Sequence, residues 1–350
     1  MTTEGYQELE EYKVAVALWK YMSPCLLILG LVGNTLSFVV LSKSSMRETT
    51  TSLYLRFLAV YDSLVLYMGL MRWWIIYLIE YDIREYSVVV CKIHTWGAYW
   101  TTHTSAWLLV SVTVERCFSV WFPHKVKIIC IKRNTYVIIA TIMLVFAMLN
   151  SHYFYGLGNY VEMIDNETEV KHCEQINDAY YNFEVFIWPW IDLCIYSVIP
   201  SSILTFCNIA IIHKVVSSSR QTLQNDSSIS SRRRQASSLT VMLLLVSFTY
   251  VVCTTPYCIY LIYENSFTPD EYANAREEAV AGLVWLVVTM LLYTNNSINF
   301  ILYSVSGKRF RDELSVLCSR QDGRSSEIYI VRVKDTGNCI RNRTLRSACE

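Results

Sequence analysis

The chain has 350 residues; 53% are hydrophobic, 14% aromatic and only 17% charged, and its formal net charge is zero. This composition is too apolar for an ordinary soluble domain, and we expect neither a nucleic-acid partner nor an enzyme. No internal repeat is evident, which argues against a solenoid, and no Cys-x-x-Cys or His-x-x-x-His pair indicates a metal site. A membrane protein is therefore favoured.

Seven long apolar segments follow one another along the chain, and each is long enough to cross a bilayer as a helix. They are residues 15–42, 52–79, 88–120, 135–155, 187–216, 238–263 and 279–304. The predicted fold class is an all-α membrane protein, a bundle of seven transmembrane helices. We expect the third segment to be the rod around which the others pack. Its ends carry Cys91 and Glu115-Arg116, roughly 37 Å apart along a helix, whereas the hydrocarbon core of a bilayer is about 30 Å thick.

The connecting segments alternate in charge along the chain. Residues 1–13, 80–87, 156–186 and 264–278 hold 19 acidic and 4 basic residues, whereas 42–51, 121–134, 214–236 and 305–350 hold 21 basic and 8 acidic residues. Because basic loops face the cytoplasm, the sequence predicts an extracellular N-terminus, residues 1–13, and a multi-pass protein of the plasma membrane. The acidic start lacks the basic region of a signal peptide, so we expect the first segment to act as an uncleaved anchor.

The longest outer segment, 156–186, carries a sequon at Asn166 and a cysteine at Cys173. The sequon lies on the side where N-glycosylation occurs, which predicts a glycoprotein. Cys173 can reach Cys91 at the outer end of the third span, and a cysteine pair on this side is expected to be oxidised. The resulting disulfide would tether the loop across the mouth of the bundle.

After the seventh span, the bundle, residues 14–305, gives way to a short amphipathic segment, 306–318. Phe310, Leu314 and Leu317 recur there at helical spacing beside basic residues, which predicts an eighth helix on the membrane surface. Cys318 at its end is a candidate palmitoylation site. The remaining residues, 319–350, have the composition of a disordered cytoplasmic tail.

Several short motifs lie along these spans. In chain order they are Gly33-Asn34, Leu58-Ala59-Val60-Tyr61-Asp62, Cys91, Glu115-Arg116-Cys117, Pro200, Cys253-Thr254-Thr255-Pro256 and Asn299-Phe300-Ile301-Leu302-Tyr303. Together they resemble the rhodopsin-like class of G-protein-coupled receptors, over roughly residues 15–318. Thr254, Phe300 and Cys117 depart from the usual tryptophan, proline and tyrosine of that class. With Asn208 and the run Asn150-Ser151-His152-Tyr153-Phe154, these departures resemble invertebrate neuropeptide receptors of the FMRFamide type.

The resemblance implies a receptor for an extracellular peptide that activates a heterotrimeric G protein and also engages arrestin and receptor kinases. Glu115 would restrain Arg116 at the cytoplasmic end of the third span in the resting state. On activation the sixth helix would swing outward, and Arg116, with Tyr303 of the seventh span, would face the G protein. Pro200 and Pro256 are expected to kink the fifth and sixth helices, because proline lacks a backbone N–H.

Asp62 lies near the middle of the second span, where a carboxylate is costly and needs polar partners. Polar residues of other spans that could converge on it are Asn34, Ser105, Asn295, Asn296 and Asn299. Two interpretations stay open. The cluster is either a structural hydrogen-bond network between helices or, as the resemblance implies, a sodium-binding pocket coupled to activation. We expect no other metal and no organic cofactor.

The ligand pocket implied by the resemblance lies between the outer halves of the helices. Its candidate contacts are Arg72, Trp73, Tyr77, Tyr99, Thr102, Trp188, Asp192, Tyr257, Tyr260, Trp285, Thr289 and Tyr293. Asp192 is the sharpest candidate, because an acid inside a span is expected to face a cavity. Arg72 is either its partner or the contact for the opposite end of a ligand. The outer segments carry 15 more acidic than basic residues, which predicts a cationic ligand, such as an amidated peptide containing arginine.

Other classes of membrane protein fit less well. An opsin would need a lysine in the seventh span, where Tyr293 stands instead, and an amine receptor would usually carry an aspartate in place of Ala98. A transporter or channel would need more ionisable residues inside its spans than Asp62, Arg72 and Asp192. The alternative that stays open is a receptor for a non-peptide ligand, or one that signals through arrestin alone.

Overall fold

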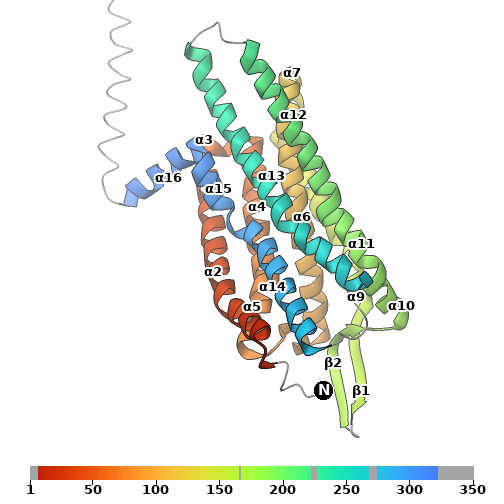
Figure 1. The fold of residues 1–350 in the computed structure, drawn as a ribbon. Coiled ribbons are helices and arrows are strands. Elements are labelled where there is room, and N and C mark those ends of the chain that lie inside the picture. The colour runs from red at the N-terminus through yellow and green to blue at the C-terminus, as the bar shows by residue number, and fades with distance from the viewer. Residues whose placement is uncertain (1–6, 165–166, 222–226, 268–273, 322–350) are drawn as a thin grey trace, which may run out of the picture.

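The structure, a computed structural model, describes residues 7–164, 167–221, 227–267 and 274–321. Two of the sites predicted from the sequence lie outside this description, namely Asn166 and the side chain of Cys318, and so does most of the predicted tail. Figure 1 shows the described chain as one bundle of long helices. A pair of strands, β1 (Leu157–Ile164) and β2 (Glu167–Gln175), lies at one end, where the first helix begins, and a short helix, α16 (Lys308–Gln321), lies at the other.

All seven predicted spans are helical, several of them in consecutive pieces. In chain order they are α2 (Glu10–Leu41); α4, η1 and α5 (Thr50–Val65, Leu66–Leu70, Met71–Ile79); α6 (Val88–Trp121); α8 and α9 (Lys132–Leu149, His152–Gly156); α10, η3, α11, η4 and α12 (Asp178–Asn182, Phe183–Ile187, Trp188–Asp192, Leu193–Val198, Ile199–Gln221); α13 (Ser227–Phe267); and α14 and α15 (Ala275–Ser297, Asn299–Ser306). Short elements between them are α3 (Ser44–Arg47), the 3₁₀ turn η2 (Ile83–Tyr86) and α7 (Pro123–Ile129). The segments η1, η3 and η4 are π-helical.

Six helical stretches of the described chain are long and apolar enough to cross a membrane, and α6 is not among them. Its 34 residues would extend about 51 Å, so length is not the reason. Its middle carries the polar run Thr101, Thr102, His103 and Thr104, which makes it less hydrophobic. Thr101, His103 and Thr104 are buried. A helix enclosed by its neighbours needs no lipid-facing apolar surface, which fits the predicted central position of α6.

The prediction that every other span packs on α6 is only partly right. Helix α6 packs on α4, α8, α12 and α13, but α2 packs chiefly on α14 and on the second span, and α14 packs chiefly on α2 and α13. The α2–α14 contact is close, because a Cβ at Gly30 would lie 2.2 Å from Leu66 Cδ1 and 3.1 Å from Ser297 Cα. Glycine at such positions allows membrane helices to approach each other.

A β-hairpin covers one end of the bundle, where the sequence indicated only a loop. Strands β1 and β2 pair antiparallel, and the predicted disulfide between Cys91 and Cys173 joins β2 to the start of α6, with a Cα–Cα distance of 5.5 Å. Beneath the hairpin, Tyr153, Tyr180 and Trp188 form a buried cluster with Cys91. The disulfide and this cluster fix the hairpin to the third, fourth and fifth spans.

At the opposite end, α16 begins two residues later than the predicted amphipathic helix and is separated from α15 by Gly307. Phe310 is buried and contacts Tyr303 of α15, with ring centroids 5.7 Å apart. The seventh span is interrupted at Ile298, although no proline stands there.

Candidate functional site

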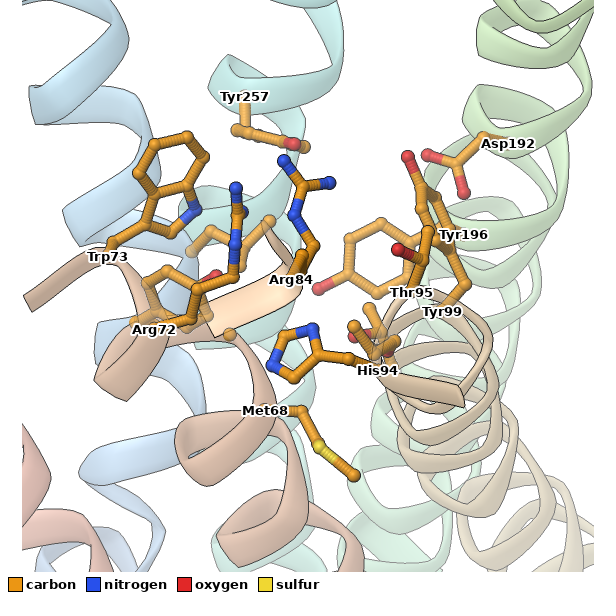
Figure 2. A pocket seen from close by; sticks show the side chains of 15 residues that line it. Met68, Arg72, Trp73, Arg84, His94, Thr95, Tyr99, Asp192, Tyr196 and Tyr257 are labelled. Carbon is orange, nitrogen blue, oxygen red and sulfur yellow. The ribbon is translucent and has the colours of Figure 1, made fainter. Parts of the chain in front are cut away.

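A cavity of about 290 Å³ opens between the spans at the hairpin end, and its volume is near the lower limit of small-molecule sites, about 300 Å³. Figure 2 shows side chains entering it from several helices and from the turn η2. The lining residues are Met68, Gly69, Arg72, Trp73, Arg84, His94, Thr95, Ala98, Tyr99, Thr102, Asp192, Tyr196, Tyr257, Leu292 and Tyr293.

Seven of the twelve ligand contacts predicted from the sequence line this cavity. They are Arg72, Trp73, Tyr99, Thr102, Asp192, Tyr257 and Tyr293. These residues come from five different spans, so the structure brings them together as the sequence suggested. Their role in binding stays a prediction.

Two predicted contacts, Tyr77 and Trp285, lie instead in an aromatic cluster that joins the first, second and seventh spans. Trp19 is fully buried between them, with ring centroids 5.2 Å from Tyr77 and 5.4 Å from Trp285. Trp73 packs edge-on against Trp285 at 4.6 Å and is the member of the cluster that reaches the cavity. The cluster therefore supports one wall of the cavity from behind.

Three further predicted contacts also lie outside the cavity lining. Trp188 is buried under the hairpin against Tyr99, with ring centroids 6.0 Å apart. The hydroxyl of Tyr260 donates a hydrogen bond to the backbone oxygen of Ala281, which joins α13 to α14. Thr289 is buried within α14. These positions support packing between helices rather than direct contact with a ligand.

Asp192 is held on one side of the cavity by a histidine. Nε2 of His103 lies 2.8 Å from Oδ1 of Asp192. Nδ2 of Asn150 donates both to Nδ1 of the same ring, at 3.1 Å, and to the backbone oxygen of Phe146, at 2.8 Å. Because an amide nitrogen only donates, Nδ1 of His103 must accept, and the ring proton is on Nε2. Nε2–H of His103 therefore donates to Oδ1 of Asp192.

Arg72 is paired with Asp82 and not with Asp192. Its Nε and Nη2 lie 2.9 and 2.6 Å from the two carboxylate oxygens of Asp82, and Nη2 of Arg84 lies 2.9 Å from Oδ2. Burial by itself would raise the pKa of Asp82, but hydrogen bonds from Arg72 and Arg84 hold it well below its usual range. The predicted pairing of Arg72 with Asp192 is therefore wrong, because a nearer carboxylate takes the guanidinium.

Eight lining residues were not predicted from the sequence. They are Met68, Gly69, Arg84, His94, Thr95, Ala98, Tyr196 and Leu292. His94, Thr95 and Ala98 precede Tyr99 on one face of α6, so extending the helical periodicity toward the start of α6 would have found them. Arg84 gave no comparable signal, because it reaches the cavity from η2. The position of that turn depends on the contact between Asp82, its N-cap residue, and Arg72 of α5.

The predicted polar network around Asp62 is present. Oδ1 of Asp62 accepts hydrogen bonds from Ser105 at 2.5 Å and from Asn296 at 2.8 Å, and Oδ2 accepts from Asn299 at 2.7 Å. Nδ2 of Asn34 donates to the backbone oxygen of Asn296 at 3.0 Å. The network joins the first, second, third and seventh spans, and its carboxylate is buried.

The same network contains oxygens that could hold a small cation. Oδ1 of Asn34, Asn296 and Asn299 are buried without a hydrogen-bond partner. Hard cations prefer oxygen ligands, so these three oxygens and the carboxylate of Asp62 fit a sodium ion. Asn295 is also buried, but it donates no hydrogen bond to Asp62.

The predicted ion pair between Glu115 and Arg116 does not form in this structure. Oε1 of Glu115 accepts hydrogen bonds from Thr50 at 2.6 Å and Thr51 at 3.4 Å, at the start of α4. Nε of Arg116 is buried and has no hydrogen-bond partner in the described chain. Glu115 therefore ties the third span to the second instead of forming a hydrogen bond with Arg116. Tyr303, the third predicted coupling residue, is buried on α15.

Seven helical spans, a disulfide-anchored hairpin over a cavity and a buried carboxylate network are together typical of a membrane receptor of the seven-helix class. Residues 33–303 match the family model described as 7 transmembrane receptor (rhodopsin family). The chain belongs to this family. It is therefore a multi-pass receptor of the plasma membrane and not an enzyme, as the sequence predicted.

Relatives of known identity fall in the same family. The chain is 25% identical to growth hormone secretagogue receptor type 1 of Mus musculus over 292 residues, which cover 82% of this chain and 76% of that receptor. It is 26% identical to the same receptor of Oryctolagus cuniculus, with the same coverage. It is 23% identical to the thyrotropin-releasing hormone receptor of Gallus gallus, over 83% of this chain and 76% of that receptor. The finer resemblance to FMRFamide-type receptors stays a prediction.

Proposed function

We propose that this receptor binds an extracellular peptide with a basic group and passes the signal to a heterotrimeric G protein. The observation that carries the proposal is the carboxylate of Asp192, which lines the cavity and accepts a hydrogen bond from neutral His103. A guanidinium or ammonium group of a ligand would complete its coordination by a charge-assisted hydrogen bond. The volume of about 290 Å³ suits the end of a peptide rather than a whole one.

The orientation and the relatives support the same proposal. The acidic connecting segments favour an extracellular position for the hairpin end, where the negative potential would attract a cationic ligand. The relatives are receptors for a growth hormone secretagogue and for thyrotropin-releasing hormone, which favours a hormone or neuropeptide. The mouth of the cavity would face this ligand, and α16 would lie on the cytoplasmic side.

Outward movement of α13 would carry the signal across the membrane. Two polar contacts tie α13 to the third and fifth spans: the hydroxyl of Tyr250 donates to the backbone oxygen of Tyr196, and the hydroxyls of Thr113 and Ser247 lie 3.4 Å apart. Tyr196 also lines the cavity, so a ligand there touches one partner of the first contact directly. Release of both contacts would open the cytoplasmic end around Arg116 to the G protein.

The remaining predictions attach to this proposal. Sodium bound at the Asp62 network would stabilise the resting arrangement of the spans. Arrestin and receptor kinases would act at the cytoplasmic side, a lipid on Cys318 would hold α16 to the membrane, and a glycan on Asn166 would mark the outer face.

A peptide screen tests the proposal. Cells expressing the full chain would receive short basic peptides, as acids and as amides, while calcium and cyclic nucleotides are read together. We expect at least one peptide to give a response that is absent from untransfected cells and from cells with Arg116→Ala at equal surface expression. A response equally strong with Arg116→Ala, or arrestin recruitment with no G-protein response, would rule out the proposed coupling.

A further inference from the structure

The wall of the cavity formed by Arg72 and Arg84 carries more positive than negative charge. Both guanidinium groups share one carboxylate, that of Asp82. The hydrogen bonds to Asp82 use Nε and Nη2 of each arginine, so Nη1 of each keeps its donors for another acceptor. Both side chains line the cavity, and Figure 2 shows the two guanidinium groups together at its centre. The wall has one positive charge in excess.

Two side chains of α6 beside this wall each contain one polar atom that lacks a partner. His94 and Thr95 are 8% and 7% exposed, and both line the cavity. Nε2 of His94 and Oγ1 of Thr95 are buried without a hydrogen-bond partner in the described chain. A buried polar atom without a partner costs free energy, so a ligand group that bonded to these atoms would gain binding strength.

The negative charge of the cavity stands apart from this wall. Asp192 comes from α11 and is bound to His103, whereas Arg72 and Arg84 come from α5 and η2 and are bound to Asp82. Figure 2 shows Asp192 beside Tyr196, across the cavity from the arginines. The cavity therefore has a cationic wall and an anionic wall.

We propose that the wall of Arg72 and Arg84 binds a carboxylate of the ligand, while Asp192 binds its basic group; this rests on the proposed function as a peptide receptor. A carboxylate only accepts hydrogen bonds and offers up to four lone-pair sites. It therefore suits the N–H donors of both guanidinium groups that do not bind Asp82, together with the hydroxyl of Thr95. A carboxamide offers one oxygen and would direct two N–H donors toward the same arginines. The proposed ligand is therefore a peptide with a free carboxylate, at its C-terminus or on a side chain.

Matched peptides test this inference on the purified full-length receptor in lipid nanodiscs. The probes are N-acetylated Arg-Phe, Arg-Gly-Phe and Arg-Gly-Gly-Phe, each as the free acid and as the amide, because each added residue lengthens the reach by about 3.5 Å. A fourth probe, N-acetylated Arg-Gly-Glu amide, carries its carboxylate on a side chain. Binding is read as the rise in melting temperature across a concentration series.

We expect an acid to bind at least tenfold more tightly than its amide, and Arg84→Gln to abolish the difference. Arg84→Lys keeps the charge and should restore part of the preference, which separates recognition from loss of the η2 fold. Arg276→Gln is the control, because Arg276 pairs with Glu11 outside the cavity. Preference for Arg-Gly-Glu amide over the acids would assign the site to an acidic side chain, which also supports the inference.

Two outcomes overturn the inference: no probe with a carboxylate, at its C-terminus or on a side chain, binds better than the amides that lack one, or the preference survives Arg84→Gln. These outcomes leave the proposed function intact, because an amidated peptide could still activate the G protein. Conversely, if the receptor binds the acids more tightly than the amides but gives no G-protein response, the proposed function is wrong and the carboxylate site is supported.

Discussion

His103 and Asp192 meet inside the bundle with Nε2 of the ring 2.8 Å from Oδ1 of the carboxylate, and Asn150 determines which ring nitrogen carries the proton. The contact is a hydrogen bond from a neutral ring and not an ion pair. Asp192 lines the cavity, whereas His103, its hydrogen-bond partner, is entirely buried.

Asp192→Asn is expected to weaken binding of a basic peptide agonist by roughly tenfold to a hundredfold. The substitution removes a charge-assisted hydrogen bond, which contributes about 1.5–3 kcal/mol. Radioligand competition on membranes measures the affinity. Asp178→Asn, an exposed carboxylate at the start of the same span, is the matched control and should leave affinity unchanged. Equal affinity of Asp192→Asn and the wild type would show that this carboxylate does not hold the ligand.

Asp82→Asn is expected to lower the melting temperature of the purified receptor at neutral pH. The two guanidinium groups would lose their shared counter-ion, at a cost of about 2–3 kcal/mol for charged hydrogen bonds. The folded pKa of Asp82 is depressed, so its stabilising contribution is complete above the unfolded value, about 4, and declines as the pH falls from there toward the folded value.

The melting difference between wild type and Asp82→Asn should consequently be the same at pH 8 and pH 5. Thermal denaturation in detergent at these two values measures it. A difference that disappears by pH 5 would mean that Asp82 in the folded protein takes up a proton well above its ordinary pKa, and the bidentate contact with Arg72 would then be wrong.

Gly30→Ala is expected to destabilise the bundle by about 1–3 kcal/mol, as overpacked substitutions do. The new methyl group would meet Leu66 and the backbone of Ser297, and a backbone cannot easily move away. Gly97→Ala is the matched control, because its methyl group would meet only the flexible end of Met68, at 3.1 Å. Melting temperatures of the two variants measured side by side should separate them; identical values would argue against the close α2–α14 contact.

Sodium ions are expected to lower agonist affinity in the wild type but not in Asp62→Ala. The carboxylate and the amide oxygens of Asn34, Asn296 and Asn299 would bind the ion and stabilise the resting arrangement. Agonist competition in sodium chloride, with choline chloride at the same ionic strength as control, measures the effect. If both salts act alike on the wild type, the network serves packing alone.

Sequence reasoning found the features that follow from a residue's depth in the membrane. Asp62 and its partners were predictable because a carboxylate at mid-bilayer needs polar neighbours, and few other polar residues lie at that depth. The Cys91–Cys173 disulfide followed from topology alone, since both cysteines fall on the outer side.

Features that depend on competition between partners could not be predicted in the same way. Arg72 had two carboxylates within reach of its span, and only the fold of η2 determined that Asp82 is nearer. Glu115 likewise accepts a hydrogen bond from Thr50 instead of pairing with the adjacent Arg116. The β-hairpin was missed because an acidic segment of mixed composition gives no clear alternating pattern.

Nucleotide exchange on heterotrimeric G proteins is the most direct test of the account. The purified receptor in nanodiscs would be mixed with each G-protein class and with the most active peptide from the screen. We predict peptide-stimulated exchange on at least one class for the wild type, a rightward shift of the dose–response curve for Asp192→Asn, and no exchange for Arg116→Ala. Exchange that is absent from every class while the peptide still binds, or that is unaffected by Arg116→Ala, would contradict the account.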